Sequence, residues 1–319
     1  MIEKFSLELP HGITLSCRAS GDRGRPVLLF LHGFPEAAFV WDAQLEHFSQ
    51  PENGGYRCVA PNLRGFERSS APSEVSAYRP KLLVQDMAAL IAIEAETRGG
   101  QLAALVAHDW GGAVAWNLAN QMPQLMKRLV IINSPHPGIF LRELKSSPAQ
   151  QAASAYMNFL IRPDAEQLLV QDDHRRLWEF LTVGRAGHQT PVWLTDEVKA
   201  QYREVWSCGL RGGCNLYRVS PLRPARPEDP AAAAIELPRE MLTIRLPTLV
   251  IWAMDDIALP PALLEGLADY IDELTVRTIA DASHWIVHER PQQVTELIAS
   301  FLPQTTGAAL GLHTLRPSH

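Results

Sequence analysis

Solid apolar runs of strand length alternate with helical patterns along most of the chain. Residues 27–31 (VLLFL) form such a run, which is typical of a strand buried on both faces of a parallel sheet. Similar runs recur at 57–60, 102–106, 129–132, 248–252 and 274–279. Between them lie patterns of helical periodicity, at roughly 39–49, 80–97, 111–122, 261–271 and 291–302. Strands that alternate with helices predict an α/β fold with a mostly parallel sheet.

Two regions depart from this alternation. Residues 5–16 alternate apolar and polar positions around a Pro-His-Gly turn, which predicts a β-hairpin. Between about 137 and 240, helical patterns occur without a convincing buried strand, and we interpret this region as a helical cap over the carboxyl end of the sheet. The predicted organisation is a core domain in two parts, 1–136 and 241–303, a helical cap, 137–240, and a flexible C-terminal tail, 304–319.

The composition narrows the class of protein. A chain of 319 residues with 46% hydrophobic residues suffices for one large α/β domain with an inserted subdomain. The net charge of −6 indicates no surface for a polyanion, so no nucleic-acid partner is expected. The four cysteines lack CxxC spacing, which favours reduced thiols. No signal-peptide pattern is visible, and no apolar stretch approaches the ~20 residues of a membrane span, so we expect a cytoplasmic protein without membrane insertion.

The first candidate for chemistry is Asp109, which lies between a strand and a helix. An apolar run precedes it at 102–106 and a helical pattern follows it at 113–119, which is the context of a nucleophile elbow. The helix N-terminus favours a negative charge, so the carboxylate is expected to be ionised. A carboxylate at an elbow attacks a carbon that bears a leaving oxygen or halogen and forms an ester on the enzyme. The alternative is that Asp109 only caps the helix.

A loop that follows the first buried strand could face this elbow. It reads His32-Gly33-Phe34-Pro35, and the backbone N–H groups of Phe34 and Trp110 would then form an oxyanion hole. The alternative is a simple turn caused by Gly and Pro.

A histidine and a second acid complete the candidate set. His284 comes just after the last strand, on the rim where such a sheet carries its catalytic groups, and His32, His108 and His288 are the alternatives. The turn after the strand 248–252 offers Asp255 and Asp256, of which we prefer Asp256. The order nucleophile, acid, histidine is the chain order of α/β-hydrolases, so His284 is predicted to be the general base and Asp256 its orienting acid.

With these motifs the chain resembles the epoxide hydrolase branch of the α/β-hydrolase fold superfamily over residues 5–303. The motifs are HGFP at 32–35, HDWGG at 108–112 and ASHW at 282–285, in that order. The resemblance implies an α/β-hydrolase fold, with a mostly parallel eight-stranded sheet, helices on both faces and an inserted helical cap. It implies chemistry without a cofactor, and the histidines show no metal-ligand spacing, so no metal is expected.

The resemblance also implies two lid tyrosines that hold and protonate an epoxide oxygen. Tyr156, seven residues before a proline, is similar to the first, and Tyr202 to the second. Tyr217, in a segment similar to the family's N-x-Y-R, is the main competitor. The alternative is that these tyrosines only pack the lid.

The predicted reaction converts a neutral epoxide and water to a vicinal diol through an ester on Asp109. The partner is a small, neutral, apolar substrate, and we expect a monomer or homodimer. The predicted substrate-binding residues are Phe34, Trp110, Tyr156, Tyr202 and Trp285. The competing functions are haloalkane or haloacid dehalogenation by the same aspartate, and ligand binding without turnover.

Overall fold

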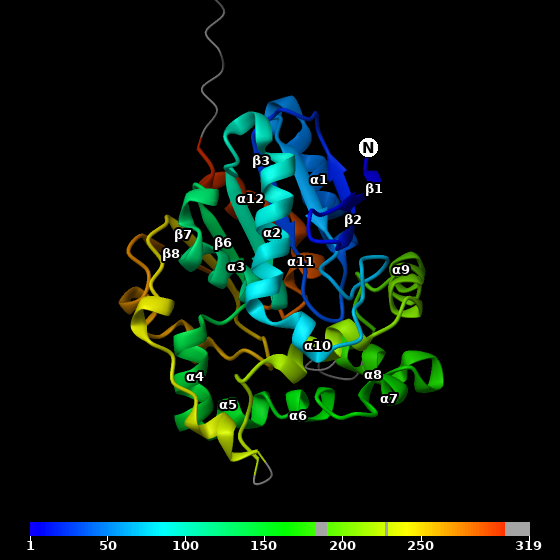
Figure 1. Cartoon of the computed structure of the whole chain (residues 1–319), viewed down its shortest axis with the longest axis vertical. Helices are drawn as coiled ribbons and strands as arrows, with labels where there is room; N and C mark the ends of the chain where they lie inside the picture. Colours follow the sequence, from blue (N-terminus) through cyan, green and yellow to red (C-terminus); the bar gives the residue numbers. More distant parts are fainter. Residues whose placement is uncertain (183–189, 227–228, 304–319) are drawn as a thin grey trace, which may run out of the picture.

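The computed structural model describes residues 1–182, 190–226 and 229–303 of the chain. Its centre is one eight-stranded sheet with the strand order β1-β2-β4-β3-β5-β6-β7-β8 (Figure 1). The strands are β1 (Glu3–Glu8), β2 (Thr14–Ser20), β3 (Val27–Leu31), β4 (Arg57–Pro61), β5 (Ala104–His108), β6 (Leu129–Ile132), β7 (Thr248–Ala253) and β8 (Leu274–Ile279). Strand β2 pairs antiparallel with β1 and β4, and all other pairings are parallel. The α/β-hydrolase fold and its hairpin are thus confirmed.

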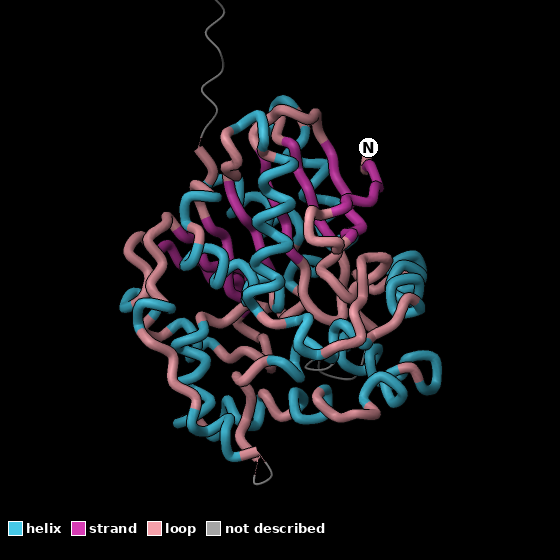
Figure 2. Tube along the Cα trace, viewed as in Figure 1, coloured by secondary structure: helices cyan, strands magenta, loops and turns pink. Residues whose placement is uncertain are grey.

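The central strands are apolar throughout because helices cover both faces of the sheet. Every residue of β3, β4, β5, β6 and β7 is buried, as expected for parallel strands without a solvated face. Helix α2 packs against α3 on one face, and α1 packs against α12 on the other (Figures 1 and 2). The core helices are α1 (Asp42–Ser49), α2 (Pro80–Glu94), α3 (Trp110–Gln121), α11 (Ile286–Glu289) and α12 (Pro291–Phe301).

Among the residues that the structure describes, seven α-helices between β6 and β7 lie together beside one end of the sheet (Figure 1). We call the described part of this region, residues 137–182 and 190–219, the helical insertion. Its members are α4 (Pro137–Ser146), α5 (Pro148–Ala153), α6 (Tyr156–Leu160), α7 (Ala165–Leu169), α8 (Gln171–Thr182), α9 (Asp196–Ser207) and α10 (Arg211–Val219). Helix α10 contacts the core where Gly212 meets Gly65. A Cβ built on Gly212 would lie 2.2 Å from the Cα of Gly65, so this close approach requires glycine.

Some predicted boundaries are wrong. The helix predicted at 261–271 is two short 3₁₀ segments, Pro261–Leu264 and Leu267–Asp269, because Gly266 between them has a φ of +83°. The predicted tail, 304–319, lies outside the described residues. Among the helices that the structure describes, none is long and apolar enough to cross a membrane.

Candidate active site

The sheet brings the candidate residues to one edge. The HGFP loop follows β3, Asp109 follows β5, and Asp256 and His284 come after the ends of β7 and β8. Because the carboxyl ends of parallel strands meet at the same edge, these loops converge although they are distant in sequence. The structure therefore gathers residues from four strand ends into one site.

Asp109 occupies a strained turn between β5 and α3. Its φ of 49° and ψ of −120° are unusual for a residue with a side chain, and the hydroxyl of Ser134 donates a 2.7 Å hydrogen bond to its carbonyl oxygen. Close packing demands glycine nearby, since a Cβ on Gly33 would lie 2.2 Å from Asp109 Oδ1 and one on Gly111 would lie 2.5 Å from the Leu31 carbonyl oxygen. The turn holds the carboxylate above the sheet edge, as at a nucleophile elbow.

The carboxylate of Asp109 does not cap its own helix. Its side chain accepts no hydrogen bond from the first turn of α3. Its Oδ1 instead accepts a 2.8 Å hydrogen bond from the backbone N–H of Phe34, across the sheet edge. Trp110 begins α3 directly after Asp109, so its N–H belongs to the same turn. The structure thus speaks against the simple helix-cap interpretation.

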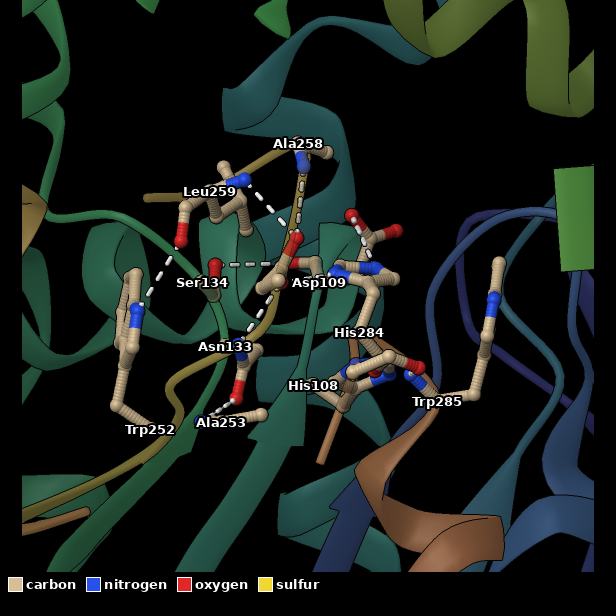
Figure 3. A network of polar contacts seen from close by, with 12 residues as sticks. His108, Asp109, Asn133, Ser134, Trp252, Ala253, Ala258, Leu259, His284 and Trp285 are labelled. Carbon is tan, nitrogen blue, oxygen red and sulfur yellow. Dashed lines mark hydrogen bonds and ion pairs between the residues drawn. The ribbon is translucent and has the colours of Figure 1, made fainter. Parts of the chain in front are cut away.

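His284 stands between two carboxylates (Figure 3). Its Nδ1 lies 2.7 Å from Asp256 Oδ2, and its Nε2 lies 3.6 Å from Asp109 Oδ2. Burial disfavours the imidazolium, but the charges of both carboxylates raise the pKa of His284 well above its ordinary value. Burial would likewise raise the pKa of Asp109, yet the contact with His284 holds it below its ordinary value. In the free protein, these charges therefore favour an ion pair of carboxylate and imidazolium.

The structure selects Asp256 over Asp255 as the partner of His284. Asp256 is 3% exposed, and its Oδ1 accepts hydrogen bonds of 2.9 Å from the N–H groups of Ala258 and Leu259. Its Oδ2 accepts a further 2.8 Å bond from the side chain of Asn133. Asp255 is exposed. The buried carboxylate thus caps a turn and orients the histidine at once.

Sequence reasoning missed Asn133. It follows β6 with a φ of 37°, and its side chain also accepts a 2.8 Å hydrogen bond from the N–H of Ala253 (Figure 3). It therefore joins the ends of β6 and β7 and orients Asp256 from below. A single Asn after an apolar run carries no signal that distinguishes this role from that of an ordinary turn residue.

Two cavities meet at Asp109. One has a volume of about 310 Å³ and is lined by residues that include Phe34, His284 and Trp285. The other, of about 370 Å³, lies on the side of Trp110 and is lined mainly by apolar side chains. Both are lined by Asp109, Tyr156 and Tyr217. Each volume lies at the lower end of the range for ligand pockets, about 300–1,000 Å³, so a ligand can extend from the carboxylate in two directions.

Comparisons with known proteins agree with this geometry. A family model described as α/β hydrolase fold matches residues 26–291. Epoxide hydrolase 3 of Xenopus tropicalis is 32% identical over 299 residues, which cover 92% of this chain and 76% of that protein. A solved structure described as novel epoxide hydrolases in metagenomes from hot environments matches with a TM-score of 0.81 and 36% identity, covering 95% of this chain and 99% of that chain. The epoxide hydrolase of Bacillus megaterium, solved with an inhibitor, has a TM-score of 0.80 and 29% identity, over 93% of this chain and 99% of that chain.

This chain belongs to the epoxide hydrolase family of α/β-hydrolases.

In this epoxide hydrolase, the tyrosines that line both cavities at Asp109 are Tyr156 and Tyr217. The ring centroids of Tyr156 on α6 and Tyr217 on α10 lie 6.1 Å apart, and the Tyr217 ring packs edge-on against Trp110, with centroids 4.9 Å apart. Tyr202 lines neither cavity at Asp109, because α9 turns it towards Glu36, which accepts a 3.0 Å hydrogen bond from its hydroxyl. Tyr217, the competitor in the N-x-Y-R segment, lies beside Asp109 instead, and the role of each tyrosine stays a prediction.

The other predicted substrate contacts lie at the cavities of this epoxide hydrolase. Phe34 and Trp285 line the first cavity, Trp110 lines the second, and Tyr156 lines both. The phenols of Tyr156 and Tyr217 stay protonated, because burial and the nearby carboxylate of Asp109 raise the pKa of each above its ordinary value. Two neutral donors therefore face a carboxylate across an apolar space.

Proposed function

We propose that the protein hydrolyses a neutral, apolar epoxide to a vicinal diol through an ester on Asp109. The observation that carries this proposal is that Asp109 lies at two mainly apolar cavities which Tyr156 and Tyr217 both line. An epoxide needs a nucleophile at carbon and an acid at oxygen, and both groups face the same space. The helical insertion acts as the cap, since it contributes both tyrosines.

The first step opens the oxirane ring. Asp109 Oδ2 attacks one ring carbon while Oδ1 keeps its bond to the Phe34 N–H. The carbon–oxygen bond to that carbon breaks, and Tyr156 and Tyr217 stabilise the developing alkoxide by hydrogen bonds. One phenol donates its proton, because an alkoxide is far more basic than a phenolate. The product is a neutral hydroxyalkyl ester on Asp109.

The second step hydrolyses this ester. Esterification removes the negative charge of Asp109, so the pKa of His284 falls. The imidazolium gives up its proton, a proton from solvent restores the phenol, and the neutral imidazole can act as a base. His284, oriented by Asp256, takes a proton from water, and the resulting hydroxide attacks the ester carbonyl. The N–H groups of Phe34 and Trp110 hold the oxyanion. Its collapse breaks the bond between the acyl carbon and the alkoxide oxygen, and the proton of the new carboxyl group passes to that oxygen, which gives the diol and the carboxylate of Asp109.

The tyrosine pair favours an epoxide over a halide as the leaving group. A halide site would need donor side chains directed at the halogen, but Phe34 carries none, and the Trp110 ring packs edge-on against Tyr217. A departing halide also needs no proton, so the two buried phenols would have no function as proton donors in that reaction. The substrate is therefore a neutral epoxide rather than a haloalkane or a haloacid.

The test is diol formation from a panel of neutral epoxides, with Asp109→Asn as the control. We expect diol from the wild type and none from the variant, and we expect His284→Gln to trap an ester that intact-protein mass spectrometry detects. Bromoalkanes and haloacetates are assayed in parallel. Halide release without diol formation would overturn the proposal in favour of dehalogenation.

A further inference from the structure

A second polar cluster lies behind His284 and has no part in the proposed reaction. It consists of Glu36, His108, Tyr202 and His288, which we call the Glu36 cluster. Glu36 Oε2 lies 3.1 Å from His108 Nδ1, and Oε1 lies 3.0 Å from the Tyr202 hydroxyl and 3.2 Å from His288 Nε2. The Tyr202 hydroxyl also lies 2.9 Å from His288 Nε2. One carboxylate thus has three partners from three other segments.

The four members come from segments whose relative positions the proposed reaction requires to be fixed. Glu36 lies in the loop that presents the Phe34 N–H, and His108 directly precedes Asp109. His288 lies on α11, four residues after His284, and Tyr202 lies on α9 of the helical insertion. The cluster therefore joins the insertion to every loop that carries a proposed catalytic group except the one with Asp256.

A carboxylate at this depth depends on its partners. Glu36 and His108 are each 1% exposed, and Tyr202 is fully buried. Burial disfavours the charged carboxylate, but hydrogen bonds from His108 and His288 hold the pKa of Glu36 well below its ordinary value. Removal of one donor leaves a buried charge underpaired, so the remaining partners must shift to compensate.

The cluster reaches His284 through its backbone. His108 Nε2 lies 2.9 Å from the His284 carbonyl oxygen, and the two rings lie 4.8 Å apart (Figure 3). Asp256 contacts His284 only at Nδ1 of the ring, so it controls the orientation of the ring but not the position of the backbone. His108 supplies that second restraint, and Glu36 in turn fixes His108.

We propose that Tyr202 and His288 are positioning residues for the general base: by holding Glu36, they fix His108 and thereby the backbone of His284, so that the docking of α9 sets the rate of ester hydrolysis. This inference rests on the proposed function. It assigns to Tyr202 a task in the second step, whereas Tyr156 and Tyr217 serve the first.

The main rival explanation is that Tyr202 only docks the insertion. A matched control exists on the same helix, because the Trp206 indole N–H donates a 2.8 Å hydrogen bond to the Pro35 carbonyl oxygen, next to Glu36. Trp206→Phe removes a docking bond from α9 without removing a donor to the carboxylate. Loss of docking alone displaces the insertion, which carries Tyr156 and Tyr217, and so impairs substrate binding and ring opening.

Single-turnover kinetics separate these explanations. For Tyr202→Phe we expect an unchanged rate of ester formation, a rate of ester hydrolysis lower by about tenfold or more, and ester visible by intact mass. Because hydrolysis becomes rate-limiting, kcat and KM fall together. Trp206→Phe should instead raise KM without ester accumulation. An unchanged hydrolysis rate in Tyr202→Phe, or equal slowing of both steps, would overturn the inference.

His288 provides a second test that does not depend on the folding of a Tyr202 variant. Its ring stacks on Trp193, with centroids 4.4 Å apart. His288→Phe keeps an aromatic ring there and removes the donor, whereas His288→Gln keeps a donor. We expect slow hydrolysis in the first and recovery in the second, and equal rates in both would contradict the inference. If His284→Gln accumulates no ester at all, the proposed function fails rather than this inference.

Discussion

Replacement of Tyr217 by Phe tests which tyrosine pair serves the epoxide oxygen. The change removes one hydroxyl from the space above Asp109 and keeps the ring, which packs edge-on against Trp110 with centroids 4.9 Å apart. Tyr156 remains as the other donor. If both phenols stabilise the developing alkoxide, the loss of one slows ring opening and spares ester hydrolysis.

The magnitude follows from the burial of the site. Tyr217 is 2% exposed, so water cannot replace its hydroxyl as a donor. Removal of one preorganised donor to a buried oxyanion costs about 10²–10³ in rate. Since Tyr156 still shares the charge, we expect a loss near the lower limit, about 10²-fold. The double variant should open the ring more slowly than either single variant.

The assay follows ester formation in a single turnover with enzyme in excess. Tyr78→Phe is the matched control, since Tyr78 also lines the second cavity but its hydroxyl donates to the Pro72 carbonyl oxygen, 2.9 Å away. That control should open the ring at nearly the wild-type rate. If Tyr217→Phe forms the ester at a rate within a few-fold of the wild type, the reasoning is refuted, and another group must bind the epoxide oxygen.

Four further outcomes are expected. Asn133→Ala should lower the free energy of unfolding by about 1–3 kcal/mol, because it leaves buried partners unsatisfied, and thermal unfolding measures this loss. The rate of ester hydrolysis should rise with pH to a plateau, because this step needs neutral His284. The rate of ester formation should fall only at the low pH at which Asp109 becomes protonated. Equal pH profiles for the two steps would contradict the assignment. The raised pKa of His284 adds stability that is fully present below its unfolded-state pKa and is lost as pH rises through the folded-state pKa. Ala153→Phe narrows the first cavity and Val219→Phe the second. Each variant should lower kcat/KM for epoxides whose bulky substituent occupies the narrowed cavity and leave kcat/KM for a small epoxide unchanged. Identical selectivity in both variants would argue against a substrate that extends into both cavities.

The sequence by itself was enough for the sheet and for the elbow. Runs such as 27–31 and 248–252 must be buried on both faces, and this requirement is written in consecutive residues. The elbow needs only a strand, Asp109 and a helix in succession, so local pattern predicted it. The prediction of a helix at 261–271 was wrong because a glycine with positive φ interrupts it, and hydrophobic periodicity does not reveal such a break.

The tertiary structure decided which side chains meet. Asp255 and Asp256 are adjacent, and only the packing of the turn buries one beside His284. Tyr202 and Tyr217 lie on successive helices, α9 and α10, and both face the protein interior. Which of them reaches Asp109 depends on how each helix docks on the core, and that docking arises from contacts between residues far apart in the chain. Spacing along one segment specifies the elements, but the relation between segments is determined only when they pack.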